Sequence, residues 1–294
     1  MKYKYMRDET EDEYGFKQLQ DKIMEIAEYI DKVCVDNKIS YCLMSGSTLG
    51  ALRHKGFIPW DDDMDIFMKP DEYKKFKEFF EKNGDTKKYY LQELYKRDDY
   101  IASAKLRLNN TAYIEESSKD MKIHQGIFID IFILHNTPDN DFLSFIQCMC
   151  AKYVLARGQM NKKNNYKGKK LLLLKLLNIL PKEFLIKHCL KKQYKYDNKT
   201  TKRVCHFMGH PFYKKGIYDS KYFLEYRRTK FEKIELNIPK YSEEYLTDRF
   251  GDYMKLPSKE SIKKAQHAWK WDISKDFSNY VNKERDFSDE KYLV

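Results

Sequence analysis

The sequence predicts an α+β protein, and three patterns along the chain lead to that prediction. Residues 16–37 place apolar side chains about one helical turn apart, which is typical of a helix that packs on a core. Residues 126–134 form an almost unbroken β-branched and aromatic run of strand length, as in a strand buried on both faces. From residue 141 onward helical patterns dominate. No Pro-, Gly- or Ser-rich linker divides the 294 residues, so we expect a single domain over residues 1–294.

The predicted elements alternate between helices and strands in the first half of the chain. The first helix has its apolar positions at Leu19, Ile23, Ile26, Ile30 and Val33. Further helices are predicted over residues 48–54 and 70–82. The predicted strands are short and cover residues 40–45, 63–68, 89–94, 102–108, 111–115 and 126–134. We therefore expect a mixed β-sheet core, flanked by helices, over residues 17–135, followed by a mainly helical region over residues 139–294.

The segment Gly46–Met68 concentrates a Gly-Ser turn, two basic residues and four aspartates. The carboxylates of Asp61, Asp62, Asp63 and Asp65 would repel one another without a counter-ion. In an extended strand Asp63 and Asp65 point to the same face. Two carboxylates on one face beside a Gly-Ser turn suit a divalent metal that carries phosphate. The alternative is a solvated acidic turn, but the apolar residues on both sides of the aspartates favour burial.

A third carboxylate, Asp130, lies inside the apolar run of residues 126–134. An ionised aspartate in such a strand costs several kcal/mol unless it is paired or binds a metal. A metal shared with Asp63 and Asp65 would supply the partner. The alternative is a structural aspartate that accepts hydrogen bonds from backbone amides at a strand end.

These residues resemble the core motif of the LicD family, which includes fukutin and fukutin-related protein. The family is similar in fold to nucleotidyltransferases, in which a Gly-Ser pair ends one strand, an Asp-x-Asp lies on the next, and a third carboxylate lies on a later strand. Gly46 and Ser47 match the first element, Asp63 and Asp65 match the second, and Asp130 matches the third. The resemblance implies a nucleotidyltransferase-like fold in which the three aspartates are catalytic and bind the metal.

The resemblance covers roughly residues 17–267 and is weak over residues 159–225. Residues 231–257 look like a second block of the family, which ends in basic residues and a histidine. Lys263, Lys264 and His267 occupy that region here.

The resemblance also implies an activity. LicD proteins transfer phosphocholine or related phospho-groups from a CDP-activated donor, so we expect a phosphotransferase that depends on Mg²⁺ or Mn²⁺. Its expected donor is CDP-choline, and its expected acceptor is a hydroxyl of a cell-surface glycan or of the lipid-linked precursor of that glycan. Lipopolysaccharide and teichoic acid are acceptors of this kind. The alternatives are ribitol or glycerol phosphate transfer from the corresponding CDP donor, or nucleotidyl transfer from an NTP.

Basic residues near the motif are candidates for binding the donor phosphates, together with Gly46 and Ser47. Arg53 and Lys55 lie between the Gly-Ser turn and the carboxylates, although either could instead pair with the aspartates. Lys105 alternates with apolar residues on a predicted strand, so it could face the same site. His267 could bond phosphate or act as an acid–base group, but a lone histidine is more often structural.

The overall charge is basic, with 56 Lys and Arg against 45 Asp and Glu. This balance suits anionic partners, although lysine-rich surfaces also arise from composition alone. A nucleic-acid-binding protein is the competing class, but the basic residues are scattered and no RNA-reading motif is present, so we expect no nucleic-acid partner. The charged fraction of 34% argues against an integral membrane protein.

Three features predict a cytoplasmic enzyme. The six cysteines include no CxxC pair, which indicates free thiols in a reducing compartment, and the first 16 residues have no apolar core. CDP-linked donors are also made in the cytoplasm. Residues 167–192 contain an apolar run flanked by lysines that is too short to span a bilayer. It could be a core helix with basic ends or a peripheral contact with the inner membrane face.

Overall fold

The computed structural model describes residues 12–94, 103–159, 182–207 and 213–281, apart from Ser117, Asp120, Lys122 and Ala265. It contains helices and several sheets, so the predicted α+β class is confirmed. The chain divides into two compact units, which are residues 1–92, 105–132 and 221–285, and residues 93–104, 133–220 and 286–294. That the whole chain acts as one domain stays a prediction.

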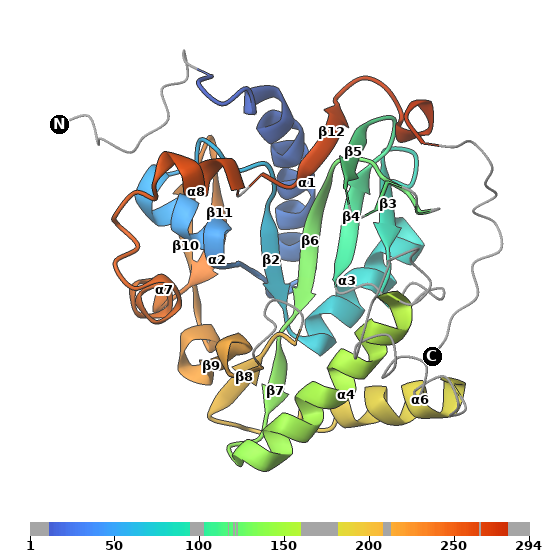
Figure 1. Ribbon diagram of the computed structural model, residues 1–294, viewed down its shortest axis with the longest axis vertical. Helices are drawn as coiled ribbons and strands as arrows, with labels where there is room; N and C mark the ends of the chain where they lie inside the picture. Colours follow the sequence, from blue (N-terminus) through green and yellow to red (C-terminus); the bar gives the residue numbers. More distant parts are fainter. Residues whose placement is uncertain are drawn as a thin grey trace. The chain divides into compact units, whose positions relative to one another are not determined.

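A five-stranded sheet forms the core of the first unit, with the strand order β1-β2-β6-β4-β3. Figure 1 shows β2, β6, β4 and β3 side by side in this order. In chain order the strands are β1 (Cys42–Leu43), β2 (Asp65–Met68), β3 (Tyr89–Gln92), β4 (Ala104–Leu108) and β6 (Phe128–Ile133). All five lie within strands that the sequence predicts. The order places β2 and β6, which carry predicted site aspartates, side by side in the sheet.

Helix α1 (Lys17–Asp36) supports both this sheet and the loop that leads into β2. The rings of Tyr29 on α1 and Tyr89 on β3 stack with their centroids 4.3 Å apart. Near the start of α1 the buried Gln20 side chain donates a hydrogen bond of 2.8 Å to the backbone carbonyl of Asp61. The helix therefore ties the aspartate-rich loop to the sheet.

The Gly-Ser turn opens helix α2 (Ser45–Leu49), which continues as the π-helical turn η1 (Gly50–His54). A Cβ atom on Gly50 would lie 2.5 Å from the carbonyl oxygen of Gly56. Such a contact is too short for any side chain, so the close approach of the two backbone segments requires glycine at position 50. Helix α3 (Pro70–Asn83) follows β2 and begins with a proline in its first turn, as predicted.

The later part of the first unit folds back onto the earlier part. Strand β12 (Ala268–Asp272) pairs antiparallel with β5 (Ala112–Glu115), although more than 150 residues separate them in the sequence. The remaining elements of this part are η3 (Ser220–Phe223), β10 (Tyr226–Phe231), β11 (Ile234–Pro239), α7 (Ser242–Phe250), α8 (Lys259–Lys264) and η4 (Phe277–Asn279). The sequence pattern predicts helices here but not β10, β11 or β12.

The second unit contains two helices and a small antiparallel sheet. Its elements are β7 (His135–Thr137), α4 (Asp141–Gln159), α6 (Lys182–Gln193), β8 (Arg203–Cys205), η2 (Tyr213–Gly216) and β9 (Ile217–Asp219), with strand order β7-β8-β9. The cysteines Cys148, Cys150, Cys189 and Cys205 are free thiols of this unit, and Cys34 and Cys42 are free thiols of the first.

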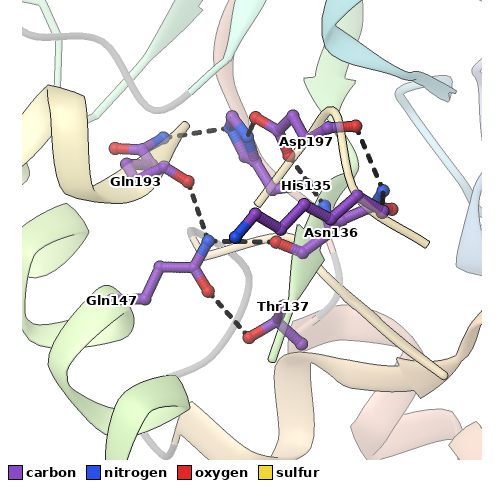
Figure 2. Close-up of polar contacts among 7 residues, drawn as sticks. His135, Asn136, Thr137, Gln147, Gln193 and Asp197 are labelled. Atoms are coloured by element: carbon purple, nitrogen blue, oxygen red, sulfur yellow. Dashed lines mark hydrogen bonds and ion pairs between the residues drawn. The ribbon is translucent and has the colours of Figure 1, made fainter. Parts of the chain in front are cut away.

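A buried polar network fastens β7 to both helices (Figure 2). His135 Nδ1 lies 2.8 Å from a carboxylate oxygen of Asp197, and the Gln193 side-chain amide lies 3.1 Å from His135 Nε2. Gln147 on α4 donates to the backbone carbonyl of Gln193 and accepts a hydrogen bond from Thr137. Because an amide nitrogen can only donate, His135 Nε2 accepts and Nδ1 donates to Asp197. The network pairs these buried polar groups and so stabilises one arrangement of the unit.

The segment at residues 167–192 is described only in part. Residues 167–181 lie outside the described residues, and residues 182–192 fall within α6. In the part of the chain that the structure covers, none of the helices has the length and apolar character that crossing a bilayer requires.

Candidate active site

The Gly-Ser turn and the Asp-x-Asp pair are held next to each other by strand pairing. Strand β1 pairs antiparallel with β2, and the chain enters α2 directly after β1. The hydroxyl of Ser47 then accepts a hydrogen bond of 3.0 Å from the backbone amide of Asp65. Ser47 is buried, and its own hydroxyl proton remains to be donated to a ligand oxygen. The two motif elements therefore form one local structure, as the sequence predicts.

Asp130 joins the other two aspartates through the neighbouring strand. Its backbone amide donates a hydrogen bond of 3.1 Å to the carbonyl of Met64, the residue between Asp63 and Asp65. The Asp130 side chain is buried on β6, as the apolar run predicts. The charge of Asp130 lies close enough to Asp63 and Asp65 to raise the pKa of both.

Lys105 is the positive charge closest to Asp130. Its Nζ lies 2.8 Å from a carboxylate oxygen of Asp130, and both side chains are about 90% buried. The same ammonium lies 3.6 Å from the ring centroid of Phe128, which adds a cation–π contact. The sequence predicts that Lys105 binds phosphate, whereas the structure shows it as the counter-ion of a candidate metal ligand.

The charge of the cluster is only partly compensated. Burial raises the pKa of Asp63 to about 6; the charge of His267 opposes this rise, and those of Asp62 and Asp130 add to it. Burial also raises the pKa of Asp65, and the charges of Asp63 and Asp130 raise it further. In the same way, burial raises the pKa of Asp61, and the charges of Asp63 and Asp62 add to the rise. Lys105 lowers the pKa of Asp63 and Asp65 but does not cancel these effects.

Asp62 lies beside Asp63 and also holds the C-terminal part of the first unit. Its fully buried carboxylate accepts hydrogen bonds from the backbone amides of His267, at 2.8 Å, and Ala268, at 2.9 Å. The His267 ring contributes Nδ1, which lies 3.2 Å from Asp62 and 3.4 Å from Asp63. The predicted site residue His267 is thus brought to the carboxylates from more than 200 residues away.

Comparison with known proteins agrees with this geometry. A family model described as the LicD/FKTN/FKRP nucleotidyltransferase domain matches residues 38–143, a range that contains the Gly-Ser turn and all the clustered aspartates. Residues 38–143 are therefore similar to the LicD domain. It is 28% identical over 246 residues to the lipopolysaccharide cholinephosphotransferase LicD of Haemophilus influenzae, and the match covers 82% of this chain and 91% of that protein.

Two shorter matches involve rickettsial proteins. Uncharacterized proteins of Rickettsia prowazekii and Rickettsia typhi are each 60% identical to this chain over 30 residues. Each match covers 10% of this chain. It covers 11% of the Rickettsia prowazekii protein and 10% of the Rickettsia typhi protein.

Other predicted residues of the LicD domain lie at the edge of the cluster or outside it. Arg53 is buried, and its guanidinium donates a hydrogen bond of 2.6 Å to the backbone carbonyl of Tyr253. Lys55 is half-buried and ends η1 with a left-handed backbone, φ 58°, while its carbonyl accepts a hydrogen bond from the Glu232 amide. Arg53 is thus oriented toward the second sequence block and Lys55 fixes a turn. A phosphate-binding role for either residue stays a prediction.

Gly46 lies against the aspartates. A Cβ atom on Gly46 would lie 3.5 Å from a carboxylate oxygen of Asp61, an ordinary van der Waals distance. The amide of Ser47 already donates to the carbonyl of Met44 within the first turn of α2. The expected role of this turn in binding phosphate therefore depends on the Ser47 hydroxyl more than on its amide.

Sequence reasoning did not assign roles to Asp61, Asp62 and Tyr113. The alternation of Asp61, Asp63 and Asp65 could have signalled a shared face for all three. Tyr113 is buried on β5; burial raises the pKa of its phenol, and the charges of Asp62 and Asp63 raise it further. No local pattern could have indicated Tyr113, because its place beside the aspartates depends on the sheet.

The cluster fits a divalent metal of the hard, oxygen-binding kind. Carboxylate oxygens are the ligands that Mg²⁺ and Mn²⁺ prefer, and burial together with the neighbouring carboxylates raises the pKa values of Asp61, Asp63 and Asp65. Among the described residues, the trio Asp62, Asp63 and His267 has ligand atoms that all lie within 4.8 Å of one another. Because Asp130 pairs with Lys105 here, its role as a ligand stays a prediction.

Proposed function

We propose that the protein is a metal-dependent phosphotransferase that moves phosphocholine from CDP-choline to a hydroxyl group of a glycan. The observation that carries the proposal is the carboxylate cluster of the half-buried Asp63 and Asp65 and the buried Asp130 inside the matched LicD domain. The similarity to the Haemophilus influenzae cholinephosphotransferase over most of both chains supports the choice of phosphocholine and of a glycan acceptor. We propose a cell-surface glycan or its lipid-linked precursor as that acceptor.

The reaction exchanges one phosphorus–oxygen bond for another. The acceptor oxygen forms a bond to the phosphorus that carries choline, the bond from that phosphorus to CMP breaks, and CMP leaves with the electron pair. Asp63 and Asp65, completed by Asp130, would hold one or two Mg²⁺ or Mn²⁺ ions. When bound, the metal neutralises charge on the donor phosphates.

The protein side chains have separate roles around this centre. The Ser47 hydroxyl is placed to donate to a phosphate oxygen while it accepts the amide of Asp65. Asp130 is the proposed acceptor for the proton of the attacking hydroxyl, since proton uptake requires a carboxylate near the site. Lys105 pairs with Asp130 before that proton arrives, and once Asp130 is neutral its ammonium can compensate the charges of Asp63 and Asp65.

A donor screen tests the proposed reaction. We expect CMP release and a higher melting temperature with Mg²⁺ and CDP-choline, and smaller effects with CDP-ribitol, CDP-glycerol or CTP. Mn²⁺ is compared with Mg²⁺, and EDTA serves as the metal-free control. If another CDP-alcohol releases CMP faster than CDP-choline, the choline assignment is wrong while the transferase class stands. If pyrophosphate is released from CTP instead, the protein is a nucleotidyltransferase.

We also propose that the enzyme is cytoplasmic and attaches to an anionic membrane through its second unit. Residues 133–220 contain 18 Lys and Arg against five Asp and Glu, so this stretch carries more than the net charge of the whole chain. On α4 the side chains of Phe142 and Phe145 are 70% and 42% exposed. Exposed aromatic rings beside many cations suit the headgroup region of a bilayer.

Sedimentation with vesicles tests this attachment. We expect the protein to sediment with phosphatidylglycerol vesicles at low salt and to stay in solution with phosphatidylcholine vesicles or at high salt. Changing Phe142 and Phe145 to Ser should reduce binding, and changing Lys169, Lys170, Lys191 and Lys192 to Glu should abolish it. If the unmodified protein stays in the supernatant at low salt, the membrane proposal is wrong.

A further inference from the structure

Asp62 is the most completely buried charged residue at the site. Its two carboxylate oxygens have different hydrogen-bond partners. Oδ2 accepts the backbone amides of His267 and Ala268, at 2.8 and 2.9 Å. Oδ1 faces the imidazole of His267, whose Nδ1 lies 3.2 Å away. One oxygen therefore fixes the backbone at the start of β12, and the other fixes the ring.

These hydrogen bonds favour the ionised form of the carboxylate. Burial alone would raise the pKa of Asp62, but the bonds from the His267 ring and from the Ala268 and His267 amides outweigh it and hold the pKa below its ordinary value. Two hydrogen bonds from backbone amides and one from the ring thus fix the side chain of Asp62 against Nδ1 of His267.

The ring of His267 is directed by this contact. Its side chain is 53% exposed, in contrast to the buried Asp62 behind it. Because Nδ1 contacts both Asp62 and Asp63, Nε2, on the far side of the ring, points away from these carboxylates. A carboxylate that holds one ring nitrogen of a histidine so that the other can act on a ligand is a recurring arrangement in enzymes.

We propose that Asp62 is a positioning residue that orients His267, so that Nε2 of His267 donates a hydrogen bond to a phosphate oxygen of the donor nucleotide. This inference rests on the proposed function, since it assumes a phosphate-bearing donor beside Asp63. It assigns Asp62 a role that differs from that of the other aspartates of the motif. Asp63 and Asp65 belong to the metal centre, whereas Asp62 acts through an imidazole.

The substitution Asp62→Asn separates the two functions of the side chain. The amide oxygen of asparagine can still accept the amides of His267 and Ala268, so the backbone contact is retained. The amide nitrogen then faces His267 Nδ1, where it can only donate, so Nδ1 can no longer donate to residue 62. Asp272→Asn is the matched control, because Asp272 also accepts backbone amides, from Ser274 and Lys275, at the other end of β12.

The first measurement needs no donor. Nitrogen-15 NMR of the metal-free protein should show a hydrogen-bonded Nδ1 proton on His267 that exchanges slowly with water. We expect this signal to shift and to exchange faster with water in Asp62→Asn, where only the longer contact with Asp63 remains, and to be unchanged in Asp272→Asn, with both variants folded. A signal unchanged in Asp62→Asn would overturn the proposed contact. Loss of the signal on adding Mg²⁺ alone would make His267 a metal ligand, which would also overturn the proposal.

The second measurement uses a double-mutant cycle in the donor assay. We expect His267→Ala to raise KM for CDP-choline by about tenfold to a hundredfold with a smaller change in kcat, and Asp62→Asn to follow the same pattern. The double variant should be no worse than His267→Ala alone, because Asp62 acts through that ring. Additive losses, or a lowered kcat with unchanged KM, would mean that Asp62 is only structural.

The two measurements keep the two proposals distinguishable. If no CDP donor is turned over, the proposed function fails, and the NMR comparison still decides whether Asp62 orients His267. If CDP-choline is turned over but the cycle is additive, the proposed function stands and the positioning role is wrong.

Discussion

Replacing Asp63 or Asp65 by Asn is expected to lower turnover of CDP-choline by about a thousandfold or more while the protein stays folded. Each change removes a negative oxygen from the proposed metal centre but keeps the shape of the side chain. The fold does not depend on these charges, because the backbone of β2 is held by its pairing with β1 and by the Ser47 hydroxyl.

The same substitutions should stabilise the metal-free protein. Burial raises the pKa of Asp63 from 3.8 to about 6, so the folded protein binds this proton more tightly than the unfolded chain does. A carboxyl whose pKa is raised on folding makes the free energy of unfolding fall as pH rises from about 4 through 6. Above that range the ionisation of Asp63 lowers the free energy of unfolding by at most about 3 kcal/mol. Asp63→Asn should therefore melt higher than the unmodified protein at pH 7 and near the same temperature at pH 3.5.

Thermal melting at both pH values, with and without Mg²⁺, checks this expectation. Asp21→Asn on the exposed face of α1 is the matched control and should change neither turnover nor the pH dependence. Mg²⁺ should raise the melting temperature of the unmodified protein and of the control, but not that of Asp63→Asn. Near-normal turnover of Asp63→Asn or Asp65→Asn with saturating Mg²⁺ would contradict the metal assignment.

The local parts of the candidate site could be predicted from the sequence because they depend on short-range patterns. The apolar run around Asp130 predicts a buried strand by itself, and the alternation around Asp63 and Asp65 predicts their common face. Burial of Asp130 is confirmed, and its backbone bond to Met64 places it beside the other two aspartates.

Long-range pairings could not be predicted in the same way. His267 reaches Asp62 because β12 pairs with β5, and no local signal identifies that pairing. The β10–β11 hairpin turns at Glu232 without the Asn-Gly or Gly residues that usually mark such turns. Glu232 adopts a left-handed backbone, φ 52°, and its carboxylate accepts the Phe57 amide at 3.0 Å. A tertiary contact thus favours a turn that local propensity does not.

For the charged residues, too, the sequence could indicate the need for a partner but not the identity of that partner. The sequence could indicate that Asp130 needs a partner, but it could not choose between a metal, backbone amides and a lysine. The structure provides Lys105, which comes from the neighbouring strand β4. Arg53, which by position could have joined the aspartates, instead bonds the carbonyl of Tyr253 in the second sequence block.

The two residues of the Lys105–Asp130 ion pair are expected to contribute unequally to the stability of the metal-free protein. Lys105→Met should destabilise the metal-free protein at pH 7 by about 3 kcal/mol or more, because it removes the ammonium that pairs with the buried Asp130 charge. Asp130→Asn should cost clearly less. In that variant Lys105 still lies near Asp63 and Asp65, whose pKa values it already lowers, so its charge remains compensated.

Urea unfolding of the two variants with and without Mg²⁺ measures this asymmetry, and calorimetric titration measures the metal affinity. Mg²⁺ should restore most of the stability of Lys105→Met, because a cation replaces the lost ammonium beside Asp130. Asp130→Asn should bind Mg²⁺ at least about tenfold more weakly if the carboxylate is a ligand. Equal destabilisation by the two changes would mean that Asp63 and Asp65 do not share Lys105 as a counter-ion. Unchanged Mg²⁺ affinity in Asp130→Asn would limit Asp130 to its pairing with Lys105 and remove it from the proposed metal centre.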